Sequence, residues 1–95
     1  MSFSLNATIT NYEFRGLRTG EGQNGTWMSL VLESPDDARQ LDVSVPRDMH
    51  GDIYSKNLQK GDHITANVRA YAGPEYSRVS LLNIISITDK EGEVI

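Results

Sequence analysis

The sequence predicts a small all-β protein, built as a five-stranded barrel with one short helix between the third and fourth strands. Apolar and polar residues alternate over most of the chain, which is typical of half-buried strands. Three such segments precede a stretch without alternation, and two follow it. The 95 residues are enough for one domain, spanning 1–95, with a polar C-terminal tail at 89–95.

The first predicted strand begins near the N-terminus. Its apolar side chains are expected to face the core, at Phe3, Leu5, Ala7 and Ile9. The alternation changes phase at Asn11, after which Tyr12 and Phe14 continue on even numbers. One extra residue reverses the faces of a strand, so we expect a bulge or sharp bend near Asn11. Whether Tyr12 and Phe14 face the core or a binding surface stays open.

Residues 16–25 are expected to form a loop, because they contain Gly16, Gly20, Gly22 and Gly25. Residues 20–25 also match the pattern G-x-G-x-x-G. That pattern binds dinucleotides when a strand precedes it and a helix follows it. Residues 26–33 alternate as a strand, so the dinucleotide interpretation is excluded.

The second and third predicted strands flank a turn. Residues 26–33 place even-numbered apolar side chains inward, which directs Trp27 outward. Residues 34–37 contain Pro and Asp, which favour a turn. Residues 40–45 alternate again and end at Pro46. The expected inward side chains are Met28, Leu30, Leu32, Leu41, Val43 and Val45.

The remaining elements follow a change of pattern. Residues 47–58 lose the alternation and are expected to contain a short helix. The fourth strand begins after residues 60–62, with Ile64, Ala66, Val68 and Ala70 inward. The fifth strand covers 76–88 and has a phase change at Leu81–Leu82. A long first strand that bends and pairs twice, with a helix after strand three, matches the OB-fold. An SH3-like barrel is the competing interpretation, but it usually lacks both features.

Three segments resemble small single-stranded DNA-binding proteins. Residues 25–32 look like their second strand, and residues 58–64 like the Gly-Asp entry into their fourth. Residues 69–82 look like their fourth and fifth strands with the intervening loop. The length favours a phage- or plasmid-type relative or a primosomal OB protein. The resemblance implies largely sequence-independent binding of single-stranded DNA in replication, recombination or repair.

Aromatic and basic side chains lie near the expected groove. A base stacked on an aromatic ring contributes about 1–3 kcal/mol, and any base can stack. We expect Trp27, Tyr71 and Tyr76 to hold bases in this way. Arginine binds phosphate through paired hydrogen bonds. The arginines expected to hold the backbone are Arg15, Arg18, Arg69 and Arg78.

The overall charge favours a different interpretation. The net charge is −4, from 13 acidic and 9 basic side chains, whereas nucleic-acid binding needs clustered positive charge. Asp42, expected to point outward on the third strand, also opposes a strongly basic groove. The alternative is an OB-fold protein-interaction module that acts as an accessory subunit without nucleic-acid binding. In that case Trp27 caps the barrel or lies in a subunit interface, while Arg69 and Arg78 are simply solvated.

Other classes of function are excluded or left open by composition. The chain has no cysteine, and His50 and His63 lack metal-ligand spacing, so we expect no metal, no cofactor and no catalytic residue. With no signal peptide and no apolar run of about 18 residues, a soluble cytoplasmic protein is expected. One OB-fold covers only about 4–16 nucleotides, so we expect a homodimer or larger assembly. DNA and RNA are not distinguished by sequence.

Overall fold

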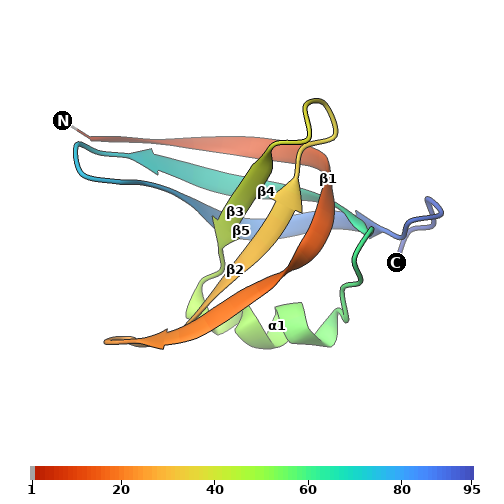
Figure 1. Cartoon of the computed structure of the whole chain (residues 1–95), viewed down its shortest axis with the longest axis horizontal. Helices are drawn as coiled ribbons and strands as arrows, with labels where there is room; N and C mark the ends of the chain where they lie inside the picture. The colour runs from red at the N-terminus through yellow and green to blue at the C-terminus, as the bar shows by residue number, and fades with distance from the viewer. Residues whose placement is uncertain (1) are drawn as a thin grey trace.

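The structure is a computed structural model that describes residues 2–95. Its elements are β1 (Phe3–Gly22), β2 (Gly25–Glu33), β3 (Gln40–Ser44), the 3-10 turn η1 (Arg47–Met49), α1 (His50–Ser55), β4 (His63–Ala72) and β5 (Ser77–Thr88). The strands form one closed sheet in the order β1-β2-β3-β5-β4 (Figure 1). The predicted all-β architecture, with five strands and a short helix between the third and fourth, is confirmed. Within residues 2–95, no helix is both long and apolar enough to cross a membrane.

β1 closes the sheet because it pairs with two strands. Its first part pairs antiparallel with β4, and its second part pairs antiparallel with β2 from Glu13 onward. The register with β4 shifts between Ile9 and Tyr12, on either side of Asn11, which has a φ of 54°. The Asn11 N–H donates to the Thr65 hydroxyl at 3.1 Å. The predicted bulge near Asn11 is therefore confirmed, at a residue type that tolerates the left-handed region.

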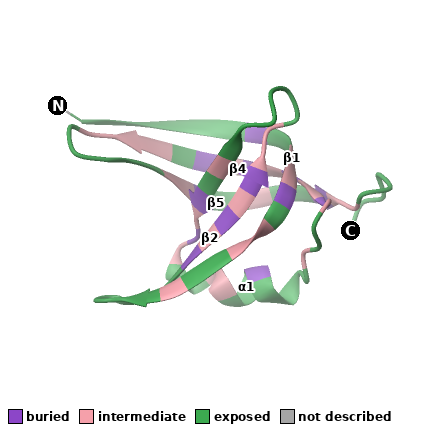
Figure 2. Cartoon of the chain, in the orientation of Figure 1, coloured by how far each residue is buried: buried purple, intermediate pink, exposed green. Residues whose placement is uncertain are grey.

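The core lies inside the closed part of the sheet (Figure 2). Its buried apolar side chains are Ile9, Phe14, Met28, Leu30, Leu32, Val43, Val45, Ile53, Ile64, Ala66, Val68, Leu81 and Ile87. The alternation predicted for β2, β3 and β4 is thus confirmed. Phe14 is 4% exposed and belongs to the core, with half-buried Tyr12 packed against it. Ile53 extends from α1 into the same cluster.

The prediction that Phe3, Leu5 and Ala7 are buried is wrong. They do share the inner face of the sheet, since they pair with Ala72, Ala70 and Val68 of β4. Yet Phe3 is 64% and Leu5 60% exposed. β1 has no β2 neighbour before Glu13, so this part of the strand runs past the region where the sheet closes.

The prediction of a loop at residues 16–25 is also wrong. β1 continues to Gly22, and only Gln23 and Asn24 separate it from β2. Gly22 and Gly25 face one another at the end of the hairpin. Cross-strand pairing with β2 overrides the weak strand propensity of the glycines.

Two projections extend from the same side of the molecule (Figure 1). The first, which we call the arm, consists of the N-terminal end of β1 and the adjoining ends of β4 and β5 (residues 3–6, 69–72 and 77–80). The second, the hairpin tip, consists of residues 19–28 of the β1–β2 hairpin. Most of the hairpin tip is exposed, as is much of the arm (Figure 2).

Candidate nucleic-acid interface

Strand register places Trp27, Tyr71 and Arg78 on the outer face of the sheet, as it does Arg18 and Arg69. Trp27 is 47% exposed and alternates with buried Met28, as predicted. Arg78 and Tyr71 are direct partners across β5 and β4, and so share a face. Ser44 of β3 pairs with Ser29 of β2 and Ser80 of β5, and this row connects the two ends of the outer face.

Trp27 rests on a glycine of the opposite strand. Gly20 is its direct partner on β1. A Cβ atom placed on Gly20 would lie 2.5 Å from Cζ2 and 2.8 Å from Nε1 of the indole. At Gly22, the nearest indole atom would be at 3.8 Å, an ordinary contact. The glycines that the sequence assigned to a loop therefore form the flat backbone under Trp27, a known use of glycine in strands.

A cleft of about 340 Å³ lies beside Trp27. Its lining consists of Gly22, Gln23, Asn24, Gly25, Thr26, Trp27, Arg47 and Arg78. Arg47, the first residue of η1, was not among the predicted site residues. The Val45 N–H donates to the Met28 carbonyl at 2.9 Å, so the chain leaving β3 passes the start of β2. Because β2 and β3 are antiparallel, the end of β3 lies beside the start of β2. The predicted strands therefore already place a residue just after Pro46 near Trp27.

A second cleft, of about 490 Å³, lies between β3 and the arm. Its lining consists of Phe3, Asp42, Ser44, Ala70, Tyr71, Ala72, Ser77, Arg78 and Val79. Arg78 lines both clefts, so they adjoin. Tyr76 lies outside them but beside Tyr71, with ring centroids 5.3 Å apart and planes tilted by 36°. Tyr76 is 60% exposed, so its ring is accessible from solvent.

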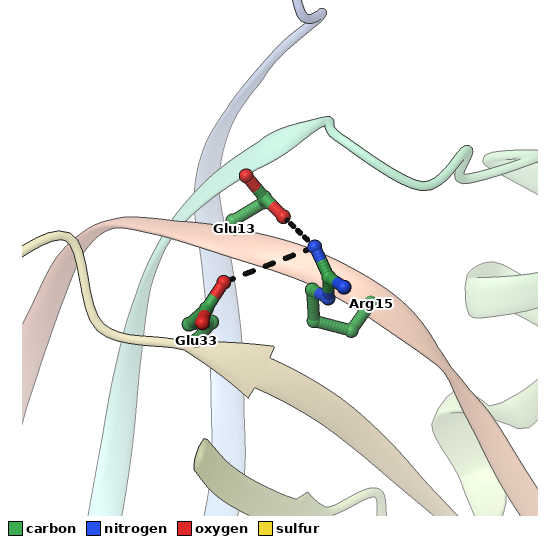
Figure 3. Close-up of polar contacts among 3 residues, drawn as sticks. All are labelled: Glu13, Arg15 and Glu33. Atoms are coloured by element: carbon green, nitrogen blue, oxygen red, sulfur yellow. Dashed lines mark hydrogen bonds and ion pairs between the residues drawn. The ribbon is translucent and has the colours of Figure 1, made fainter. Parts of the chain in front are cut away.

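Arg18 and Arg15 are paired with carboxylates. Nη1 of Arg18 lies 3.1 Å from Oδ2 of Asp42, so these two opposite charges offset one another on the outer face. Arg15 donates a hydrogen bond to Glu13 and lies 3.8 Å from Glu33 (Figure 3). The hydrogen bond to Glu13, together with the charges of Glu13 and Glu33, raises the pKa of Arg15. Neither arginine lines the two clefts.

Arg69 belongs to a polar network on another part of the outer face. Its Nε donates to Oδ1 of Asn6 at 3.1 Å. Another row of paired residues across β1, β4 and β5 lies nearby. In it, the Thr8 hydroxyl donates to Asn67, and the Asn67 amide donates to Asn83. Arg69 therefore lines neither cleft, whereas Trp27, Tyr71 and Arg78 do.

Among the arginines that the structure describes, three have no carboxylate partner: Arg69, which bonds to Asn6 instead, and the two that line the cleft beside Trp27. Within residues 2–95, Arg47 and Arg78 form no ion pair, unlike Arg15, Arg18 and Arg39. The outer face thus has unpaired positive charge next to Trp27, even though the chain as a whole is acidic.

Comparisons with known proteins identify no relative. No family model matches this sequence, and searches of curated proteins and of solved structures find no match. A function for this protein is therefore argued from the geometry of the two clefts.

Proposed function

We propose that this protein is an OB-fold that binds single-stranded DNA, largely without sequence preference, along the surface between the hairpin tip and the arm. One observation carries the proposal: Arg78 lines both clefts, so Trp27 on one side and Tyr71 on the other border a single path. The strand order β1-β2-β3-β5-β4 and the helix between β3 and β4 support the OB-fold assignment.

Binding of this kind is not catalytic. Bases stack on Trp27, Tyr71 and Tyr76, and guanidinium groups contact the phosphates between them. Every base has a π-face, which is why such a surface tolerates any sequence. The net charge of −4 does not prevent this, because the contacts are short-range and charges beyond about 8–10 Å are screened at physiological salt. A role in replication, recombination or repair follows from a preference for unpaired strands.

We also propose that two copies associate through the open edge of the arm. In β1, Phe3 to Ile9 pair with β4 on one side, and within the described chain no strand pairs with the other side. Residues 2–9 carry no charged side chain, although exposed edges are normally protected by charge. Phe3 and Leu5 add exposed apolar surface there. A second copy pairing along this edge covers both features and doubles the length of DNA held.

The proposal is tested by titrating the protein with an oligo-dT of about 16 nucleotides, the upper site size of one such domain. Trp27 is the only tryptophan, so its fluorescence reports one position. We expect quenching, with affinity that falls steeply as salt rises. Tyr76→Ala should lower the affinity about 10–100-fold through loss of one stacked base.

Tyr54→Ala is the matched control. Tyr54 is 59% exposed, against 60% for Tyr76, but it lies on α1 and lines neither cleft. Its replacement should leave the affinity unchanged. Absence of both quenching and binding at low salt would contradict the proposal and favour the protein-interaction module. Tighter binding of oligo-U than of oligo-dT would assign the surface to RNA instead.

A further inference from the structure

We propose that Arg47 and Arg78 together form a phosphate site beside Trp27, which holds one nucleotide of the bound strand by its base and its phosphate. This inference rests on the proposed function and assigns a role to Arg47, a residue outside the sheet. With this phosphate site, the cleft beside Trp27 is a defined nucleotide subsite rather than a stretch of basic surface.

The position of Arg47 is set by a second glycine of the hairpin. A Cβ atom placed on Gly25 would lie 2.7 Å from Nη2 and 3.0 Å from Cζ of Arg47. The guanidinium therefore rests directly against the backbone at the start of β2, two residues before Trp27. Gly25 has a φ of 102°, in the region that favours glycine, so this backbone stays free of a side chain for a conformational reason as well.

The charges around this cleft favour an anion. Arg47 from η1 and Arg78 from β5 both line it, and none of its lining residues is acidic. The neighbouring cleft, in contrast, contains Asp42. Two guanidinium groups that share a cleft without a carboxylate repel one another, and a bound phosphate removes that repulsion. Guanidinium also matches phosphate oxygens with paired, charge-assisted hydrogen bonds.

The remaining lining indicates that the anion belongs to a nucleotide. The indole of Trp27 lines the same cleft and is 47% exposed, so it offers an aromatic surface to a base. A free inorganic anion would use only the two arginines. At about 340 Å³, the cleft is at the small end of ligand sites and suits one nucleotide rather than several.

The test compares two arginine-to-alanine variants of the full chain with the same oligo-dT. Arg47→Ala should weaken binding about tenfold and reduce the slope of log affinity against log salt by about one, because one phosphate contact is lost. Arg39→Ala removes the same charge from the β2–β3 turn, where the Arg39 side chain is 85% exposed and lines neither cleft. It should change neither quantity. Arg47→Lys should keep the salt slope but recover only part of the affinity, since lysine lacks the planar fork.

A double variant tests whether the two arginines hold the same phosphate. If they do, Arg47→Ala combined with Arg78→Ala loses less affinity than the two single losses added together. Fully additive losses would overturn the shared site, as would equal salt slopes for Arg47→Ala and Arg39→Ala. In both cases the wild-type protein would still bind oligo-dT, and the proposed function would stand. Failure of the wild-type protein to bind would instead overturn the proposed function itself.

Discussion

The closed part of the sheet and the arm are built from the same alternating pattern, but they bury it differently. Leu30 in the closed part is 0% exposed, whereas Leu5 in the arm is 60% exposed, although both lie on the inner face of the sheet. Strands on all sides surround Leu30. Leu5 lies where three strands run on past the closure. Alternation therefore determines which face a side chain occupies, and closure of the sheet determines whether that face is buried. The closed part contributes stability, and the projections contribute accessible surface.

The largest effect that separates the two regions is on stability. Leu30→Ala should lower the free energy of unfolding by about 2–5 kcal/mol, because it removes buried methyl groups and leaves a cavity. Leu5→Ala should change the same free energy by no more than about 0.5 kcal/mol, since its side chain is already in water. Urea unfolding followed by circular dichroism, at a protein concentration too low for self-association, measures both values.

For Leu5→Ala, the strength of the dimer can be measured as well as the stability of the monomer. If the edge of the arm pairs with a second copy, Leu5→Ala weakens the dimer in sedimentation while the monomer stays folded. A large loss of monomer stability from Leu5→Ala would show that the arm is packed against something within the chain, and the distinction between the two regions would fail.

The sequence predicted the strands better than it predicted where the sheet closes. The phase change at Asn11 and the alternation around Leu30 depend on neighbouring residues, so both were predictable. The exposure of Phe3 was not predictable, because it depends on where β1 begins to pair with β2, at Glu13, ten residues further along β1. The β1–β2 hairpin was missed for a similar reason, since glycine-rich strands are specified by their partner rather than by their own propensity.

The candidate site was likewise predictable where it depends on one strand, and not where it depends on how strands meet. Trp27 was placed outward by the alternation of its own strand. Arg47 was missed because it follows β3 and lies near Trp27 only through the antiparallel pairing of β3 with β2. The ion pair between Arg18 and Asp42 joins strands on either side of β2, so it depends on the register of three strands rather than on a local pattern. Asp42 opposed a basic groove when the sequence was considered alone, but in the structure its charge is offset by Arg18.

A second, smaller effect distinguishes two glycines within the hairpin tip. Gly20→Ala places a methyl group 2.5 Å from the indole, so the ring of Trp27 must move. We expect a shift in tryptophan emission and an affinity for oligo-dT that is lower by about tenfold, as part of one base stack is lost. Gly22→Ala adds the same methyl group at 3.8 Å from the indole and should change neither. Identical emission spectra for the two variants would show that Trp27 does not depend on Gly20.

The smallest effect comes from the one carboxylate in the path. Asp42→Asn removes a negative charge from the cleft next to the arm and releases Arg18, whose guanidinium is 3.1 Å away. Exposed ion pairs contribute only about 0.2–1 kcal/mol, so the fold should be unaffected while affinity for oligo-dT rises about two- to fivefold. Asp36→Asn makes the same charge change at the β2–β3 turn, away from both clefts, and should leave affinity unchanged. Equal gains from the two variants would mean that the strand responds to the net charge of the protein rather than to a path through this cleft. A gain confined to Asp42→Asn would place the phosphates beside β3, between the hairpin tip and the arm.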